Sequence, residues 1–319
     1  MLAVRMVRTL SKHVAKQLSE RPRIVHGQDF PTIEGWSVDL SAKTPSVSAE
    51  PTSNVVWSDE RGFSISQVGP AGSKRMQVTF GTDISMEVDG LQRRVSNTSW
   101  RELNSADAHH FLADQVYPRI LAQEGALIVH AGSFISRDRS VLLLGPSGRG
   151  KSTLIASFDQ SGFVSMGDDA CWISNEDGFA LAESLYPSLR LFQDSLAAVF
   201  AGTIQTAPVG SHTMKRRVAP RPYLESRKVP VAAVFSIAEA RSDEITVQRL
   251  SNADACMTCV ENSFALDPSN AAQAAWRLKQ ASYLARAVPF FEIAYPRDYA
   301  RLPEVRRAIL DQVALLEPA

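Results

Sequence analysis

The sequence has few cysteines and no excess of either charge. Its 319 residues include three cysteines, and Lys+Arg and Asp+Glu both number 34, so the formal net charge is zero. That is too few cysteines for a disulfide scaffold, and the Cys256-x-x-Cys259 pair lacks the further Cys or His ligands of a structural zinc site. We expect both thiols to be buried on a helix, with a metal or redox role as the alternative. The balanced charge argues against a general nucleic-acid-binding protein.

The sequence also lacks a long hydrophobic run. No stretch approaches the ~20 consecutive apolar residues of a membrane-spanning helix, and the N-terminal segment has no apolar core of the signal-peptide type. That segment is basic instead, because Arg5, Arg8, Lys12 and Lys16 precede its first acid, Glu20. Transit peptides and membrane-surface helices share this charge pattern, but we favour a short basic helix or a loose tail. We therefore expect a cytoplasmic protein that binds neither membranes nor nucleic acid.

Changes in composition along the chain divide it into parts. A hydrophobic content of 45% is enough to build a sizeable core. Residues 37–54 are rich in Ser, Thr, Pro and Ala, so we group residues 1–54 as a basic segment followed by a linker. Short apolar runs separated by Gly and Asp then predict a small antiparallel β-rich region over residues 55–104. Residues 105–319 have the alternating helix and strand patterns of an α/β domain.

The middle of the chain has the element order of a phosphate-binding unit. Apolar residues at helical spacing predict a helix over residues 110–121, and apolar strands with a charged hairpin turn follow over residues 126–144. A glycine-rich loop, a helix over 152–161 and a strand over 163–166 come next. Strand, glycine loop, helix, strand and acid is the order of a P-loop α/β unit.

The glycine-rich loop carries the most specific motif in the chain. It matches Gly-x-x-x-x-Gly-Lys-[Ser/Thr] in full, through the residues Gly145, Pro146, Ser147, Gly148, Arg149, Gly150, Lys151 and Ser152. Glycines leave no Cβ between the chain and the phosphates, so the loop amides and the helix N-terminus can converge on phosphate oxygens. Lys151 supplies a point charge near the β- and γ-phosphates, and the Ser152 hydroxyl can ligate magnesium. We therefore predict that this loop, together with Thr153, binds a nucleoside triphosphate with magnesium.

Three polar residues stand at the ends of strands near this loop. His130 ends the apolar strand before the hairpin, while Asp168 and Asp169 end the strand after the P-loop helix. If both strands flank the P-loop strand, a carboxylate there could bind magnesium through water or accept a proton from a hydroxyl nucleophile. Two adjacent carboxylates leave one for each role. The alternatives are an ordinary metal ligand for Asp168, a turn or cap residue for Asp169, and a core histidine for His130.

These residues resemble the catalytic domain of the HPr kinase/phosphorylase family. The resemblance rests on His130-Ala131, on the P-loop and on Gly167-Asp168-Asp169, and it covers roughly residues 105–316. It is closest to the HPr-kinase-related serine kinases, some of which act on lasso-peptide precursors. The fold that it implies is α/β, with a P-loop kinase core like that of phosphoenolpyruvate carboxykinase.

The resemblance also implies roles for individual residues. Asp168 would be the base that activates a serine hydroxyl, and His130 would lie near the transferred phosphate. Ser152 would hold magnesium with an acid, which we take to be Asp169. The nucleotide implied is ATP, and the chain has no Asn-Lys-x-Asp motif of the GTPase type.

Some positions depart from the family pattern. Ala131 stands where the HPr kinases proper have Gly, and the Glu-x-Arg-Gly stretch that bears a metal ligand is absent from the sequence. Glu183 and Asp194 are the candidate replacements for that ligand. The Arg-Pro-Gly-Arg signature is also absent, and only Pro220-Arg221-Pro222 is similar to it. The phosphorolysis and phosphatase reactions of the founding family are therefore not implied.

The segment Lys215-Arg216-Arg217 is the densest basic cluster. One of its side chains could reach the γ-phosphate as a charge clamp, or the cluster could dock an acidic substrate segment. A solvated loop is the plain alternative.

The sequence predicts an ATP-dependent kinase whose acceptor is an alcohol group, and we expect this to be a serine on a small protein or peptide. The alternatives are a small-molecule kinase or phosphotransferase on the same scaffold, and a non-catalytic ATP-binding module. A transporter-type ATPase is disfavoured because no Leu-Ser-Gly-Gly-Gln-like signature is present. A peptide substrate could add a strand to the N-terminal sheet, and homo-oligomers are common among HPr kinases.

Overall fold

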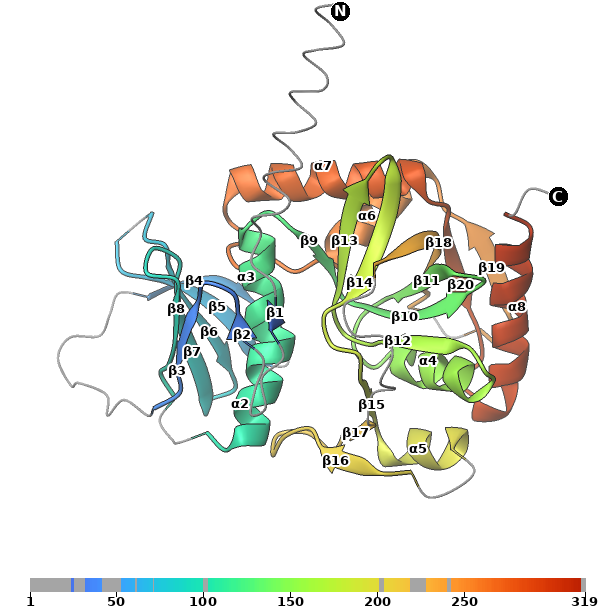
Figure 1. Ribbon diagram of the computed structural model, residues 1–319, viewed down its shortest axis with the longest axis horizontal. Coiled ribbons are helices and arrows are strands. Elements are labelled where there is room, and N and C mark those ends of the chain that lie inside the picture. The colour runs from blue at the N-terminus through green and yellow to red at the C-terminus, as the bar shows by residue number, and fades with distance from the viewer. Residues whose placement is uncertain are drawn as a thin grey trace, which may run out of the picture.

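The computed structural model describes residues 24–25, 32–41, 53–60, 62–70, 72–99, 103–200, 204–218, 228–239 and 242–316. Figure 1 shows a smaller sheet of N-terminal strands beside a larger mixed sheet, with a helical segment between the two. The predicted basic segment at residues 1–20 lies outside the described residues, as does most of the predicted linker.

The larger sheet contains nine strands within the described ranges. These strands are β9 (Leu127–Val129), β10 (Ala131–Ser136), β11 (Arg139–Leu144), β12 (Val164–Gly167), β13 (Cys171–Glu176), β14 (Phe179–Ser184), β18 (Val229–Ile237), β19 (Thr246–Arg249) and β20 (Phe290–Ala294). Their order is β12-β10-β11-β18-β14-β13-β9, and β20 and β19 continue beside the second half of β18. β18 runs parallel to β11 and to β20, and the other neighbours are antiparallel. The mixed α/β class predicted from the sequence is confirmed.

Helices cover both faces of the larger sheet and one face of the smaller one. They are α2 (Ser105–Phe111), the π-helical turn η1 (Leu112–Val116), α3 (Tyr117–Gln123), α4 (Lys151–Gln160), α5 (Gln193–Val199), α6 (Asn252–Glu261), α7 (Ala271–Ala287), the 3-10 turn η2 (Tyr299–Arg301) and α8 (Leu302–Ala314). None of the described helices is both long and apolar enough to cross a bilayer.

The strand β11 shows why the larger sheet has two covered faces. Val141 and Leu143 pack with α4 and α8, while Leu142 and Leu144 pack with α6 and α7. Successive side chains of a strand point to opposite faces, so a continuous apolar run is buried on both.

The Cys256-x-x-Cys259 pair lies on α6, against the core between this helix and the sheet. Both residues are buried and carry free thiols, as the sequence predicted. Burial raises the pKa of the Cys259 thiol to about 12, which keeps it protonated and unreactive at neutral pH.

The smaller sheet holds six strands in the part of the chain that is described. They are β3 (Ser37–Asp39), β4 (Ser53–Ser58), β5 (Phe63–Val68), β6 (Arg75–Phe80), β7 (Ile84–Asp89) and β8 (Arg94–Asn97), in the order β3-β8-β7-β6-β5-β4. The antiparallel pairing predicted for residues 55–104 is confirmed for β4 to β8. β3, which lies within the predicted linker, joins the sheet as a parallel edge strand beside β8. A two-stranded ribbon, β1 (Ile24–Val25) with β2 (Thr32–Ile33), precedes it.

The continuous helical segment α2–η1–α3 joins the two parts of the molecule. Its buried residues Phe111, Leu112, Val116, Ile120 and Leu121 form one core with the inner face of the smaller sheet. The helix predicted over residues 110–121 is therefore confirmed, although it starts earlier and serves the N-terminal sheet. Trp172 and Tyr186 of the larger part belong to the same core.

The π-helical turn in this segment has a local cause. Pro118 lies in the first turn of α3, has no N–H to donate, and would clash with the carbonyl of Asp114 in a regular α-helix. Widening the preceding turn relieves this conflict, and a single π-helical turn within an α-helix is the usual form of this rare structure. One consequence is that the buried Asp114 projects away from the smaller sheet and toward the larger part.

A close contact between β10 and α4 gives the first prediction. A Cβ placed on Gly132 would lie 2.7 Å from Cγ1 of Ile155, which is too close for any real contact. We expect Gly132→Ala to lower the free energy of unfolding by about 1–3 kcal/mol, measured by denaturant titration. Ile155→Ala alone should cost about 2–5 kcal/mol. The double variant should lose less free energy of unfolding than the sum of the two single losses, because Ile155→Ala removes the atom that clashes with the added Cβ. A loss equal to that sum would contradict the contact.

Candidate active site

The glycine-rich loop joins the end of β11 to the first residue of α4. Gly145, Gly148 and Gly150 have φ angles of 139°, 85° and 89°, which residues with a Cβ rarely adopt. Gly150 is the N-cap of α4, so the loop ends at a helix N-terminus with its free amides. Lys151 is buried and its Nζ donates to the carbonyls of Gly145, at 2.5 Å, and Pro146, at 3.1 Å. The loop therefore has a backbone shape suited to an anion, with a lysine folded across it.

A cavity of about 610 Å³ opens over this loop. Most of the site residues predicted from the sequence form its wall, namely His130, Ser147, Gly148, Arg149, Gly150, Lys151, Ser152, Thr153 and Asp169. Asp168 is fully buried behind the wall, next to Ser152. The rest of the wall is formed by Arg190, Leu191, Phe192, Asp194, Ser195, Lys215, Glu239, Tyr295, Arg297, Asp298, Tyr299 and Leu302. The volume lies within the ~300–1,000 Å³ typical of small-molecule sites.

The two acids predicted from the sequence follow β12 and meet His130. Asp168 donates its backbone N–H to Ser188, and its carboxylate accepts the backbone N–H of Arg190 at 3.1 Å. Asp169 has a φ of 75°, a conformation that Asp tolerates better than most residues. This turn brings Oδ1 of Asp169 to 3.1 Å from Nε2 of His130. The structure thus places His130 and Asp169 together on the cavity wall, with Asp168 buried behind it.

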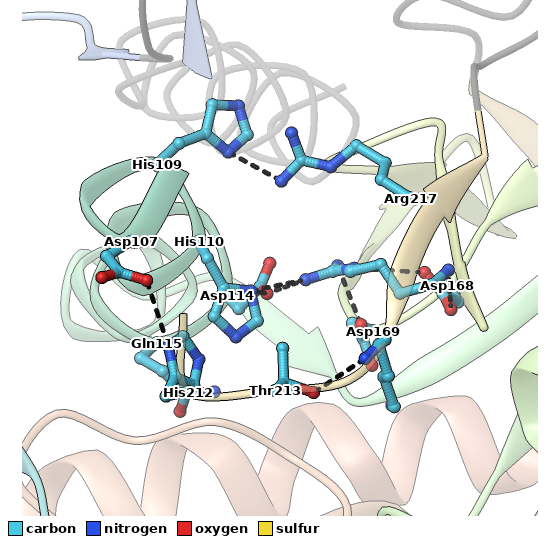
Figure 2. Close-up of polar contacts among 12 residues, drawn as sticks. Asp107, His109, His110, Asp114, Gln115, Asp168, Asp169, His212, Thr213 and Arg217 are labelled. Atoms are coloured by element: carbon cyan, nitrogen blue, oxygen red, sulfur yellow. Dashed lines mark hydrogen bonds and ion pairs between the residues drawn. The ribbon is translucent and has the colours of Figure 1, made fainter. Parts of the chain in front are cut away.

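Arg190, which the sequence analysis did not select, binds both of these acids. It lies on β15 (Leu189–Leu191), an edge strand of a three-stranded sheet whose central strand, β17 (Arg216–Val218), pairs with β15 and with β16 (Thr206–Pro208). Its Nη2 lies 2.8 Å from Oδ2 of Asp169, its Nε lies 3.6 Å from Oδ1 of Asp168, and its Nη1 pairs with Asp114 of η1. Figure 2 labels the three carboxylates that these contacts join, Asp114, Asp168 and Asp169.

The burial of this cluster makes its charges interdependent. The side chains of Arg190, Asp114 and Asp168 are at most 6% exposed. Buried charges are costly unless they are paired and hydrogen-bonded, so the guanidinium and the carboxylates are stable only together. In the sequence, no local pattern marks this arginine, which stands between Leu189 and Leu191. The available signal is that a charged residue within a buried apolar strand needs a buried partner.

The protonation states differ between the neighbouring groups. Burial and the adjacent charge of Asp169 raise the pKa of Asp168, which makes it the more basic carboxylate of the two. For Asp169, burial alone would raise the pKa, but the hydrogen bond from His130 outweighs it and holds the pKa of this carboxyl well below the usual range. Burial and the charge of Lys151 lower the pKa of His130, so that we expect a neutral imidazole at pH 7.

The basic cluster predicted at residues 215–217 is divided among three environments. Lys215 lines the cavity, with its Nζ 5.4 Å from the ring centroid of Phe192. Arg216 donates to the side chain and carbonyl of Thr206, whereas Arg217 lies 3.0 Å from Nδ1 of His109. Lys215 is therefore the member of the cluster that lines the cavity.

The two candidates for the missing metal ligand, Glu183 and Asp194, lie in different places relative to the cavity. Glu183 lies on β14 opposite Trp172 and is not among the residues of the cavity wall. Asp194, at the start of α5, is part of the wall and accepts a hydrogen bond from the Tyr299 hydroxyl at 2.9 Å. Of the pair, only Asp194 is placed to meet a ligand in the cavity.

The residues present fit a magnesium ion only together with a phosphate ligand. Among the described residues, no group of three or more His, Cys, Asp and Glu side chains could hold a metal by itself. The fitting donors are the Ser152 hydroxyl and the adjacent acids, since Oδ1 of Asp168 is buried and has no hydrogen-bond partner in the described part of the chain. Mg²⁺ commonly takes one or two carboxylates and completes its octahedron with water and substrate phosphates.

Comparisons with known proteins give little further guidance. No protein-family model matches the chain, and no curated protein matches it. Among solved structures, the HPr(Ser) kinase/phosphatase from Coxiella burnetii is similar, at 10% identity and a TM-score of 0.33. That match covers 60% of this chain and 99% of the other. With so low a TM-score and identity the likeness carries no argument about activity, which has to be argued from the site itself.

The buried guanidinium predicts a large stability effect. We expect Arg190→Met to lower the free energy of unfolding by about 3–5 kcal/mol, or to prevent folding, because it leaves the buried carboxylates unpaired. Arg301→Met is the matched control: Arg301 pairs with Glu304 on the surface, and an exposed pair contributes about 0–1 kcal/mol. Denaturant titration and soluble yield measure both. Similar small losses in the two variants would contradict the structural role of Arg190.

His110 predicts a pH dependence of stability. Burial and the charge of Arg190 lower its pKa to about 3 in the folded chain, against about 6.5 in an unfolded chain. The unfolded state therefore binds a proton that the folded state does not, and stability falls as the pH drops from about 6.5 toward 3. We expect His110→Asn to flatten this fall by up to about 1.4 kcal/mol per pH unit, the limit for one proton. Urea titrations at several pH values measure it, and an unchanged slope would refute the prediction.

Proposed function

We propose that this chain is an ATP-dependent kinase that transfers the γ-phosphate of ATP to a hydroxyl group. The acceptor that we propose is a serine of a small protein or peptide. The observation that carries the proposal is the placement of Asp168 and Asp169, held by Arg190 beside a glycine loop that opens α4. A phosphate-binding loop alone fits any nucleotide-binding protein, whereas a pair of acids at its side fits chemistry at the outermost phosphate.

Each side chain has a role in this proposal. The loop amides and Lys151 bind the phosphates, which requires Lys151 to exchange its present carbonyl partners for phosphate oxygens. Ser152 and Asp169 would hold a magnesium ion, whose charge would offset that of the phosphates. Asp168 accepts the proton of the acceptor hydroxyl, and His130 fixes the orientation of Asp169 through their hydrogen bond. The resemblance of His130, the P-loop and the acid pair to the HPr-kinase-related serine kinases supports a serine as the acceptor.

The binding and chemical steps can be separated by two variants. We expect Lys151→Met to remove the heat released on mixing with Mg-ATP in calorimetry, because the phosphates lose their buried cation. Asp168→Asn should still bind Mg-ATP, but should lose about 10²-fold or more of the rate of phosphate transfer. The matched control is Lys279→Met, since Lys279 lies over Trp276 on α7, outside the cavity wall.

The assay uses labelled ATP, magnesium and a set of serine-containing peptides, with small hydroxyl metabolites in parallel. Label on metabolites alone would replace the peptide acceptor by a small molecule while keeping the kinase. The proposal fails if the unaltered protein gives no heat with Mg-ATP. The role of Asp168 fails if Asp168→Asn transfers phosphate at the original rate.

A further inference from the structure

The loop between β16 and β17 carries Lys215 to the cavity wall. This hairpin loop, residues 209–215, leaves β16 after Pro208 and returns at Arg216. Its first residue, Val209, is fully buried, and Lys215 donates its backbone N–H to the Thr213 hydroxyl at 3.2 Å. Burial of Val209 holds the start of the loop, and the position of the loop decides where the Lys215 side chain lies.

Asp107 of α2 is the strongest polar attachment of this loop. Its carboxylate accepts the backbone N–H of Ser211 at 2.6 Å and the Ser211 hydroxyl at 2.7 Å, and it lies 3.4 Å from Nδ1 of His212. Asp107 is fully buried, and the side chain of Asn104 donates to it at 2.8 Å. A buried carboxylate with several donors fixes the position of the backbone that supplies them.

Packing reinforces the same attachment. The His212 ring stacks on His110 of α2, with ring centroids 4.7 Å apart, and meets Phe80 of β6 edge-on at 5.4 Å. At Gly210 an added Cβ would lie 2.7 Å from Oδ1 of Asp107, so the loop backbone lies directly against the carboxylate. Figure 2 shows Asp107, His110 and His212 together on the side of the site opposite Asp168. The loop is therefore docked on the N-terminal part of the molecule.

Lys215 is a cation of the cavity wall that is available for a ligand. Arg190 is held by carboxylates, and Lys151 is folded over the loop carbonyls. No carboxylate lies within ion-pair distance of Lys215 in the described part of the chain, where its recorded contact is the Phe192 ring. Lys215 lines the same cavity as Asp169, and its charge is one of those that act on that carboxylate.

We infer that Lys215 contacts the terminal phosphate of the bound nucleotide and that Asp107 is a positioning residue, which holds the hairpin loop so that Lys215 reaches it. The inference rests on the proposed function and adds a second cation to the phosphate site. It also gives the N-terminal part of the chain a role in binding the nucleotide. A cation that contacts only the γ-phosphate strengthens the binding of ATP but not that of ADP, which lacks this phosphate.

Calorimetry with Mg-ATP and Mg-ADP tests this inference without any acceptor. We expect Lys215→Met to raise the Kd for Mg-ATP by about tenfold or more, as expected for the loss of a contact to a charged group. The Kd for Mg-ADP should change by less than about twofold, and Lys215→Arg should restore most of the discrimination. Asp107→Asn, and more mildly Ser211→Ala, should reduce the ATP-to-ADP preference by about threefold to tenfold. An unchanged Kd for Mg-ADP shows that each variant is folded.

The double variant Asp107→Asn/Lys215→Met decides the route of the effect. If Asp107 acts through Lys215, the double variant has the same ATP-to-ADP preference as Lys215→Met alone. The positioning role would be overturned if Asp107→Asn reduced the ATP-to-ADP preference as much in the Lys215→Met background as in the unaltered protein. A normal preference in Asp107→Asn alone would also overturn it. A normal preference in Lys215→Met would overturn the contact with the terminal phosphate. If the unaltered protein bound neither nucleotide, the proposed function itself would fail, which is a different result from any of these.

Discussion

The arrangement of the site depends on one buried guanidinium group. Arg190 ties together the acid turn after β12, the backbone of β15 and the π-helical turn of the N-terminal helix, through Asp168, Asp169 and Asp114. Arg190, Asp114 and Asp168 are almost completely withdrawn from bulk water, so the charge of each depends on the others. The constraint is geometric as well as electrostatic, because the planar fork of an arginine fixes the directions of its partners. The acids are therefore positioned before any ligand binds.

The helix α2–η1–α3 belongs to two structures at once. One side buries its apolar residues against the smaller sheet, and the other side presents Asp107 and Asp114 to the site. The two parts of the chain are consequently not separable at the start of this helix. A fragment beginning near residue 105 would expose the apolar side while keeping the polar one, so loss of function in such a fragment would not identify a docking surface.

The sequence predicts those features of the fold and site that are encoded locally. The glycine loop, the helix after it, and the positions of His130, Asp168 and Asp169 at strand ends follow from short-range patterns, and the structure places them together. Arg190 and Asp114 could not be predicted, because their significance arises only from a contact between segments far apart in the chain. In the sequence Arg190 is a charge between two leucines, and Asp114 is an ordinary polar position of an amphipathic helix. The same holds for the division of residues 215–217, which alternation along β17 and the attached loop determine.

The π-helical turn at Leu112–Val116 has an evolutionary consequence. Such a turn is equivalent to one extra residue inserted into an α-helix, so a descendant or relative lacking one residue here would have a regular helix. Each residue advances an α-helix by about 100°, and that loss would rotate everything before the turn relative to everything after it. Either the apolar side or the carboxylates would then face the wrong way. The number of residues at this point of the helix therefore matters to the site as well as their identity, and an alignment gap there would mark a chain with a differently built site.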